Sequence, residues 1–409
     1  MEQYVQEWLS LLLRWLHFVA GAAWIGTSFY FNWLNHTLRP PPDGKPGVSG
    51  ELWAIHGGGF YHVQKYGVAP AKLPETLHWF KWEAYTTWLS GVALLTVVYY
   101  WGQRVPMLQP EWAHVGQLGA VGLGLGSLTL GWLFYHALCR SPLRKRDDLI
   151  FLSVFGFVLA LAYGLSQVFT GRVAYIHVGA TLGTLMALNV FFVIIPGQRA
   201  MVDAMTRGEA PDPEQGKAGA QRSLHNNYFT LPVLFMMISN HYPHTFAHTY
   251  NWQILIGLTL IGAGTRHYFN RKHQGKHQVW ILPVAALAML ALAFVVRPVE
   301  PDAVAQPNLP PELQASPGGL SARALQGKEV FKQTAVPQCI VCHTLEDAGS
   351  TGAVGPNLDV LKPSVAQVLQ AVKAGKGAMP SQVQHLSPQQ QEAVAQYVYE
   401  ASRGGREKP

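Results

Sequence analysis

The feature that most constrains this chain is a series of long apolar runs that fills the first 297 of its 409 residues. A helix needs roughly 20 consecutive apolar residues to cross the hydrocarbon core of a bilayer. Most of the runs reach this length, and the pattern predicts an all-α, polytopic bundle of eight transmembrane helices. The eight runs are residues 8–34, 84–101, 115–138, 149–169, 173–196, 224–241, 252–269 and 278–296.

The composition supports a chain that lies largely in lipid. Only 13% of the residues are charged, which is about half the share of an ordinary soluble domain. A wholly soluble enzyme is therefore not expected, and a disordered chain is excluded because there is ample apolar surface to bury. The run at 224–241 is the weakest, because Pro232 interrupts its firmly apolar part, residues 228–239.

The basic residues between the runs predict the orientation. The loops that would lie on one side carry 17 Lys and Arg residues, against 3 beside the membrane on the other side. The positive-inside rule then places both termini on the periplasmic side of a bacterial inner membrane. The net charge of +7 follows from this asymmetry, so no nucleic-acid partner is inferred. Residues 1–7 lack Lys and Arg, so we expect the first run to remain as an anchor instead of a cleaved signal peptide.

The character of the sequence changes after residue 297. Residues 298–319 are rich in Pro and Gly, which is typical of a semi-rigid linker. Residues 320–409 have the size and polarity of a small soluble domain. The chain is therefore predicted to consist of an integral membrane domain at 1–297, this linker, and a soluble domain.

The strongest motif in the chain is C-x-x-C-H at residues 339–343. The two thiols of this motif add to the vinyl groups of haem, and the adjacent imidazole reaches the iron. A zinc site would need a second pair of Cys or His residues, and only His385 follows. We therefore predict one haem c, bound covalently by Cys339 and Cys342, with His343 as an iron ligand.

Met379 is the predicted second iron ligand, with His385 as its competitor. It is the only methionine after residue 289, and it lies in a loop before a predicted helix. The region resembles a class I cytochrome c domain, with a helix near residues 320–333, a Gly-Pro-Asn-Leu loop at 355–358 and a helix near 388–402. Bacteria attach haem c outside the cytoplasmic membrane, which agrees with the predicted orientation.

Two histidines fall within apolar runs in the outer half of the predicted bundle. His17 is expected roughly 13 Å and His177 roughly 6 Å from the outer ends of their helices, at 1.5 Å per residue. An ionisable side chain inside a membrane span is costly and is therefore a candidate functional group. One hypothesis is a second haem, of the b type, between His17 and His177. The alternative is that each histidine only forms hydrogen bonds between helices.

A second group of candidates lies at the inner ends of the runs. Residues 78–85 combine aromatic and polar side chains, and on a helix Glu83 would share a face with Trp79. Residues 222–228 bring a cation and two amides to the start of the sixth run. The alternatives are an interfacial aromatic belt for the first stretch and an ordinary loop for the second.

The membrane part is similar to the bacterial membrane-bound urate oxidase (urate hydroxylase) family, in which an integral membrane domain precedes a C-terminal cytochrome c. The likeness is carried by residues 56–66, 77–91 and 222–243 together with the C-x-x-C-H motif. It implies oxidation of urate to 5-hydroxyisourate. It also implies that electrons leave through cytochrome c instead of reducing oxygen directly, with a soluble cytochrome c or a terminal oxidase as the next acceptor.

Urate chemistry assigns roles to the inner-side residues. Urate is a planar anion near neutral pH and loses two protons on oxidation, so its site needs stacking faces, a cation or amide, and bases. The predicted bases are Glu83, His78 and His225. The predicted stacking and ring-edge contacts are Trp79, Trp82, Tyr85, Arg222 and Asn226.

Three questions stay open at this level. A site on the inside and a haem on the outside require either a relay for the electrons or a deeper site near His17 and His177. The chain could instead be an electron-transfer subunit of a respiratory complex without a substrate of its own. It could also be a transporter whose cytochrome tail senses the redox state.

Overall fold

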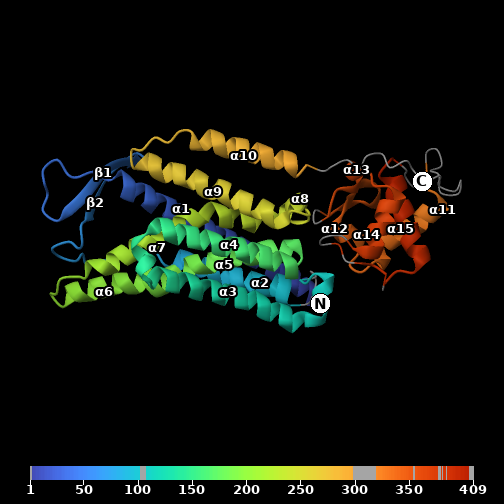
Figure 1. Cartoon of the computed structure of the whole chain (residues 1–409), viewed down its shortest axis with the longest axis horizontal. Coiled ribbons are helices and arrows are strands. Elements are labelled where there is room, and N and C mark those ends of the chain that lie inside the picture. Colours follow the sequence, from blue (N-terminus) through green and yellow to red (C-terminus); the bar gives the residue numbers. More distant parts are fainter. Residues whose placement is uncertain are drawn as a thin grey trace.

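The computed structural model describes residues 2–101, 107–297, 319–352, 355–375, 379, 381–383 and 385–404. These residues form a long helix bundle and a smaller helical unit beyond one end of it (Figure 1). We call this end of the bundle the cytochrome end, and the opposite end, which carries a β-hairpin, the hairpin end. Almost all of the linker predicted at 298–319 lies outside the described residues.

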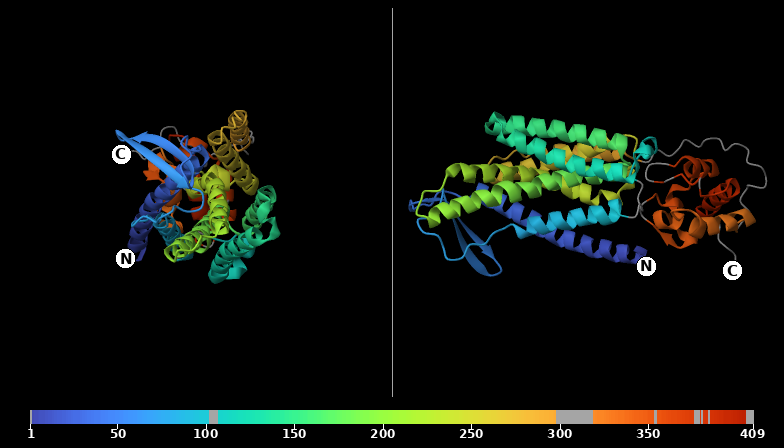
Figure 2. Two further views of the ribbon diagram at one scale, coloured as in Figure 1. Left: turned by 90° about the vertical axis from the view of Figure 1, so that its left-hand side faces the viewer. Right: turned by 90° about the horizontal axis from the view of Figure 1, so that it is seen from below.

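The helices of the bundle run side by side, as the two views of Figure 2 also show. Two of them contain a single π-helical turn, at Thr96–Tyr100 after α2 and at Val190–Ile194 between α5 and α6. The helices are α1 (Glu2–Thr37), α2 (Trp82–Leu95), α3 (Gly116–Arg140), α4 (Asp147–Val168), α5 (Gly171–Asn189), α6 (Ile195–Thr206), α7 (Pro213–Ile238), the short α8 (Pro243–Phe246), α9 (Asn251–His273) and α10 (Ile281–Val295).

Four helical segments of the described chain are long and apolar enough to cross a membrane. These are Tyr4–Thr37, Pro110–Arg140, Asp147–Val168 and Gly171–Thr206. The protein is thus mostly helical with four apolar helices of membrane length, and the predicted count of eight spans is not established. The other four runs also fall on helices, but α2 and α10 are only 14 and 15 residues long. Helices α7 and α9 carry buried arginines, which lower their hydropathy.

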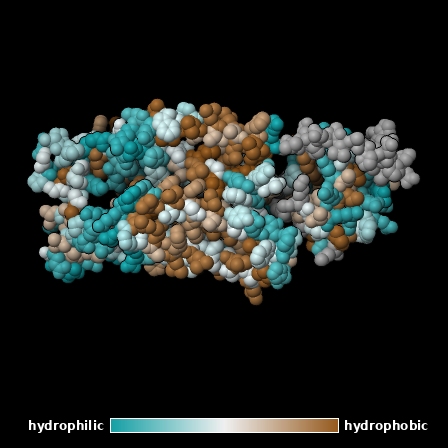
Figure 3. All heavy atoms as spheres, viewed as in Figure 1, coloured by the Kyte–Doolittle hydropathy of each residue, from teal (hydrophilic) through white to brown (hydrophobic). Residues whose placement is uncertain are grey.

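Helix α5 forms the centre of the bundle. It contacts α2, α3, α4 and α7, so it must present small or apolar side chains on every face. Gly179 allows a close approach of α7, since a Cβ there would lie 2.8 Å from the Cβ of Met236. Helix α1, in contrast, leaves Trp15 and Phe18 67% and 71% exposed. Figure 3 shows an apolar band across the middle of the bundle and hydrophilic ends, as expected where lipid surrounds the middle.

Helix α7 continues through Pro232 without a break. A proline inside a helix removes one backbone donor and crowds the preceding turn. The neighbouring α9 accommodates it at Gly262, where a Cβ would lie 3.3 Å from the Cδ of Pro232. The helix also starts earlier than the predicted run, because the Asp212 side chain caps its first turn by accepting from the amide of Glu214 at 2.9 Å.

A β-hairpin lies in the segment that was predicted as a loop between the first two runs, so the all-α prediction is incomplete here. Strand β1 (Val48–His56) pairs antiparallel with β2 (Gly59–Tyr66). Gly57 and Gly58 form the turn with φ angles of 58° and 80°. Positive φ at both central residues is the geometry of a type I′ hairpin turn, which glycine adopts without strain.

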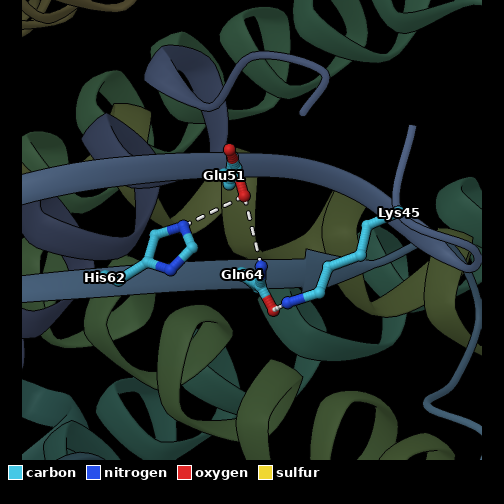
Figure 4. A network of polar contacts seen from close by, with 4 residues as sticks. All are labelled: Lys45, Glu51, His62 and Gln64. Carbon is cyan, nitrogen blue, oxygen red and sulfur yellow. Dashed lines mark hydrogen bonds and ion pairs between the residues drawn. The ribbon is translucent and has the colours of Figure 1, made fainter. Parts of the chain in front are cut away.

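A small polar network connects the strands of this hairpin (Figure 4). The Glu51 carboxylate is hydrogen-bonded to Nε2 of His62 at 3.0 Å and accepts from Nε2 of Gln64 at 3.2 Å. Lys45 donates to Oε1 of Gln64 at 3.5 Å. Trp53 stacks on the His62 ring with the centroids 4.3 Å apart. These cross-strand contacts hold the register of the two strands.

The smaller unit has its own apolar core. Its first and last helices, which were predicted near residues 320–333 and 388–402, pack against each other. They cross at Gly327, where a Cβ would clash with the backbone carbonyl of Ala393. The helices of this unit are α11 (Ala322–Glu329), α12 (Cys339–Cys342), α13 (Leu358–Leu361), α14 (Val365–Ala374) and α15 (Pro388–Ala401).

Candidate functional site

The C-x-x-C-H motif is arranged to hold haem c. Helix α12 is a single turn that begins with Cys339 and ends with Cys342, and both thiols are free. Nδ1 of the buried His343 lies 3.0 Å from the backbone carbonyl of Pro356. When Nδ1 donates to this carbonyl, Nε2 keeps its electron pair for the iron, which is how metal-binding imidazoles are usually oriented. The residues therefore fit covalent haem c.

The Gly-Pro-Asn-Leu loop supports His343 from one side. Gly355 packs directly against the imidazole, since a Cβ there would lie 2.6 Å from Nδ1. Its amide also donates to the carbonyl of Cys342 at 2.6 Å. Asn357 starts α13 by accepting from the amide of Asp359 at 2.9 Å. Only glycine at residue 355 allows this approach of the loop to the ring.

Met379 and His385 differ in their surroundings. Met379 is partly buried and packs against the core cluster that Cys339 also borders. His385 is exposed. A partly buried methionine at this core suits an axial ligand better than an exposed imidazole does, so Met379 stays the predicted second ligand.

His17 and His177 contact different residues. Nδ1 of His17 contacts the Thr87 carbonyl at 2.9 Å, and the ring packs on Gly91 of α2. Both nitrogens of His177 are occupied, Nδ1 by the Val173 carbonyl at 2.8 Å and Nε2 by the Tyr100 hydroxyl at 2.9 Å. Both histidines are thus hydrogen-bonded to groups of the protein, and the second haem stays a prediction.

The predicted aromatic stretch lies at the start of α2. Trp79 and Tyr85 pack around Val190 and Ile195, whereas Trp82 is 66% exposed. His78 is exposed and contacts the neighbouring Phe80 ring, with centroids 4.5 Å apart. The Glu83 carboxylate has no hydrogen bond or ion pair to any described residue. The stretch therefore does not converge on one pocket, and its outer part resembles an interfacial belt.

The second predicted group does converge, around Asn189 at the end of α5. Arg222 donates to Oδ1 of Asn189 at 3.0 Å, and Nδ2 of Asn189 donates to Oδ1 of Asn226 at 2.8 Å. The Arg222 guanidinium also lies 4.7 Å from the centroid of the Tyr135 ring. The Tyr135 hydroxyl is 2.8 Å from Nδ1 of His225. Three of the predicted residues thus belong to one buried network between α3, α5 and α7.

This network predicts a measurable coupling. Asn189→Ala removes the acceptor of the buried Arg222 and is expected to cost about 3 kcal/mol of stability, because a buried charged donor is left unpaired. Thermal unfolding in detergent, followed by tryptophan fluorescence, should show the loss. Adding Arg222→Met should restore most of it, since the unpaired charge is then gone. Equal melting of Asn189→Ala and the unchanged protein would contradict this assignment.

A cavity of about 980 Å³ opens beside this network, between the hairpin ends of α3, α6 and α7. Arg222 forms part of its wall, as do Trp132 and His136 from α3 and Phe192 from the π-helical turn. The Trp132 and Phe192 rings are stacked with centroids 5.8 Å apart, and Trp132 also meets the His136 ring at 4.8 Å. The rim is basic, with Arg140, Arg144, Lys145 and Lys217.

A second buried arginine was not predicted from the sequence. Arg266 of α9 donates from Nε to Oδ1 of Asn227 at 2.7 Å, and Asn270 donates to the same atom at 3.0 Å. The guanidinium lies 4.1 Å from the centroid of the Phe29 ring. Nη2 of Arg266 and Oδ1 of Asn270 have no partner among the described residues. This cluster joins α1, α7 and α9.

Comparison with protein families decides what the larger body is. The model of the family described as "Urate oxidase N-terminal" matches residues 3–297, which is more than half of the chain. The chain belongs to the urate oxidase N-terminal family. The smaller unit matches the family described as "Cytochrome C oxidase, cbb3-type, subunit III" over residues 322–398. The protein is thus a urate oxidase N-terminal domain fused to a cytochrome c domain, and the motif implies covalent haem c.

One solved structure similar to the cytochrome c domain is the c-type cytochrome SorU from Sinorhizobium meliloti. The sequences are 43% identical over a match that covers 21% of this chain and 97% of SorU, with a TM-score of 0.20.

Membership of this family points to an oxidoreductase that couples urate oxidation to electron transfer. The urate oxidase N-terminal domain contains both buried arginine clusters, so the choice between them rests on their geometry. Trp132, His136 and Phe192 were not among the predicted site residues. Trp132 and His136 are four residues apart on an apolar helix and therefore share a face, which is the signal that would have found them.

Proposed function

We propose that this membrane protein oxidises urate to 5-hydroxyisourate and passes the two electrons to its own cytochrome c domain instead of directly to oxygen. Urate and one water give 5-hydroxyisourate, two electrons and two protons. The observation that carries the proposal is the fusion, in one chain, of the urate oxidase N-terminal domain with a haem c attachment site. When bound, haem c supplies a one-electron acceptor.

The residues of the membrane domain have to bind the anion, orient its ring and accept protons. Arg222 and Asn226 remain the proposed groups for the ring edge, and their shared network with His225 supports this. The roles proposed for Glu83 and His78 as bases, and for Trp79, Trp82 and Tyr85 in stacking, have weaker support, because these side chains point to different neighbours. A b-type haem on His17 and His177 is not part of the proposal, since both nitrogens of His177 are occupied.

We further propose that the helices of all eight predicted runs span a bacterial inner membrane, with the cytochrome c domain on the periplasmic side. Each predicted run falls on a helix of the bundle, and the basic loops gather at the hairpin end. The cytochrome c unit lies at the opposite end, with α12 turned toward the bundle (Figure 1). This arrangement would give electrons a short path from the bundle to the haem-binding motif.

An anaerobic reaction tests the proposal. The detergent-solubilised protein is fully oxidised, urate is added without oxygen, and the haem absorption and the urate concentration are followed together. We expect two haems to be reduced for each urate consumed. No reduction by urate, with dithionite still reducing the haem, would contradict the proposed function and favour a respiratory subunit or a redox-sensing transporter.

A further inference from the structure

The cavity between α3, α6 and α7 combines three features that a planar anion needs. Its wall carries the stacked Trp132 and Phe192 rings, with Phe192 54% exposed. The wall also carries Arg222, which is only 3% exposed and uses one terminal nitrogen for Asn189. His136 is also in the wall, and its Nδ1 has no hydrogen-bond partner among the described residues. A stacking face, a fixed cation and an imidazole thus line one space.

The backbone beside this cavity departs from regular α-helix. Asn189 ends α5, and the next five residues form the π-helical turn that carries Phe192. Single π-helical turns inside long helices occur frequently at functional sites, because they are retained despite poorer hydrogen bonding. Here the turn separates Asn189, which faces the buried network, from Phe192, which faces the cavity. The π-helical turn therefore positions both Asn189, which binds Arg222, and Phe192, which forms part of the stacking wall.

The charged residues at the rim of the cavity also favour binding of an anion. Arg140, Arg144, Lys145 and Lys217 line the rim, and Glu214, the acidic residue of the rim, is paired with Lys217 at 2.9 Å. A cleft lined mainly by one sign of charge raises the local concentration of the opposite charge. Guanidinium groups are suited to binding planar oxygen-bearing anions because their donors form a rigid fork.

From these observations we propose that urate binds in this cavity, with its ring stacked on Trp132 and Phe192 and its anionic edge on Arg222. His136 accepts one of the two protons that the oxidation releases. The inference rests on the proposed function for the identity of the anion, and it assigns binding to side chains that the predicted site lacked. The Arg266 cluster is the competing position, because it also has unpaired polar atoms.

Binding and turnover are measured separately to test the proposal. Dithionite-reduced holoprotein has no electron acceptor, so it binds urate without consuming it, and anaerobic equilibrium dialysis with radiolabelled urate gives Kd. The oxidised protein gives kcat and KM. Trp132→Leu is expected to raise Kd about tenfold or more, as loss of base–aromatic stacking does. Arg222→Lys should also raise Kd, since it keeps the charge and loses the fork. His136→Gln should lower kcat much more than it raises Kd.

The matched control is Trp112→Leu. Trp112 is 38% exposed and also stacks on an aromatic ring, that of His114, but it lies at the cytochrome end. The Kd of the Trp112→Leu variant for urate should equal that of the unchanged protein. Arg207→Gln removes an exposed, ion-paired cation from the hairpin end and controls for the general positive potential. Covalent haem content and thermal unfolding of each variant show whether it is folded.

The outcomes separate the two proposals. Normal Kd and KM in folded Trp132→Leu and Arg222→Lys, with urate oxidised as usual, would overturn the binding site and leave the proposed function intact. Raised Kd in both variants, in a protein that never passes electrons from urate to haem, would support the site and overturn the function. A raised Kd in Arg266→Gln alone would move urate to the junction of α1, α7 and α9 and overturn the site proposed here.

Discussion

Alanine at both Cys339 and Cys342 is expected to abolish urate oxidation while the membrane domain stays folded. Thioether bonds to these two sulfurs are the covalent attachment of haem c, and the proposed reaction needs an acceptor for two electrons. Membranes containing the variant should show no covalent haem in a pyridine haemochrome spectrum and no urate consumption. Val341→Ala, at the exposed position between the cysteines, keeps both attachment points and should retain haem and activity.

Repeating the test in air distinguishes electron transfer through haem c from direct reduction of oxygen. In air, a protein that reduced oxygen directly would still consume urate and produce peroxide without haem c. Continued urate loss with peroxide formation in the Cys339→Ala/Cys342→Ala variant would therefore contradict the proposed electron route. The linker separates these cysteines from the membrane domain in the sequence. Misfolding of the helix bundle is therefore not the expected cause of a loss of urate oxidation.

The features that could be predicted from the sequence are those that local chemistry determines. The apolar runs predicted helices because a long apolar segment in lipid has to satisfy its backbone internally. The C-x-x-C-H motif predicted haem c because its three haem-binding side chains lie within five residues of one another. The helices at both ends of the cytochrome c domain were predicted for the same reason, from short-range patterns around residues 320–333 and 388–402.

The membrane site could be predicted only in part, because its contacts join distant segments. Arg222 and Asn226 were recognisable as polar residues beside an apolar run, but their common partner Asn189 is 33 and 37 residues away. Nothing in the sequence shows that Arg266 shares a cluster with Asn227 across 39 residues. Residues 78–85 looked like a site because aromatic and charged groups were adjacent, yet in the fold their side chains diverge.

The hairpin was missed although its signal was present. Gly57-Gly58 between two segments rich in β-branched and aromatic residues is a strong local indication of a two-residue turn. The stretch lay in a loop between predicted membrane helices, and this context hid it. Its strands include exposed aromatic residues, such as Trp53 and Phe60 at 64% and 76%, which also resemble part of a membrane-associated helix in composition.

Gly355→Val is expected to slow urate-driven haem reduction by about 10- to 100-fold, the usual effect of disturbing a group that orients a metal ligand. A Cβ at this residue would lie 2.6 Å from Nδ1 of His343, so the ring has to leave the position in which the Pro356 carbonyl holds it. The thioether bonds do not depend on this contact, so covalent haem content should stay near normal. The absorption spectrum should instead show altered axial ligation.

Pro356→Ala provides the matched comparison, because it changes the next residue of the loop and keeps the backbone carbonyl that accepts from His343. If the carbonyl contact orients the ligand, Pro356→Ala should resemble the unchanged protein far more closely than Gly355→Val does. Equal damage from both variants would mean that rigidity of the loop, and not the contact with the imidazole, maintains the haem site. An unchanged spectrum and rate in Gly355→Val would mean that His343 is free to move without loss. That result would contradict the proposal that the Gly355 contact and the Pro356 carbonyl orient the His343 imidazole toward the iron.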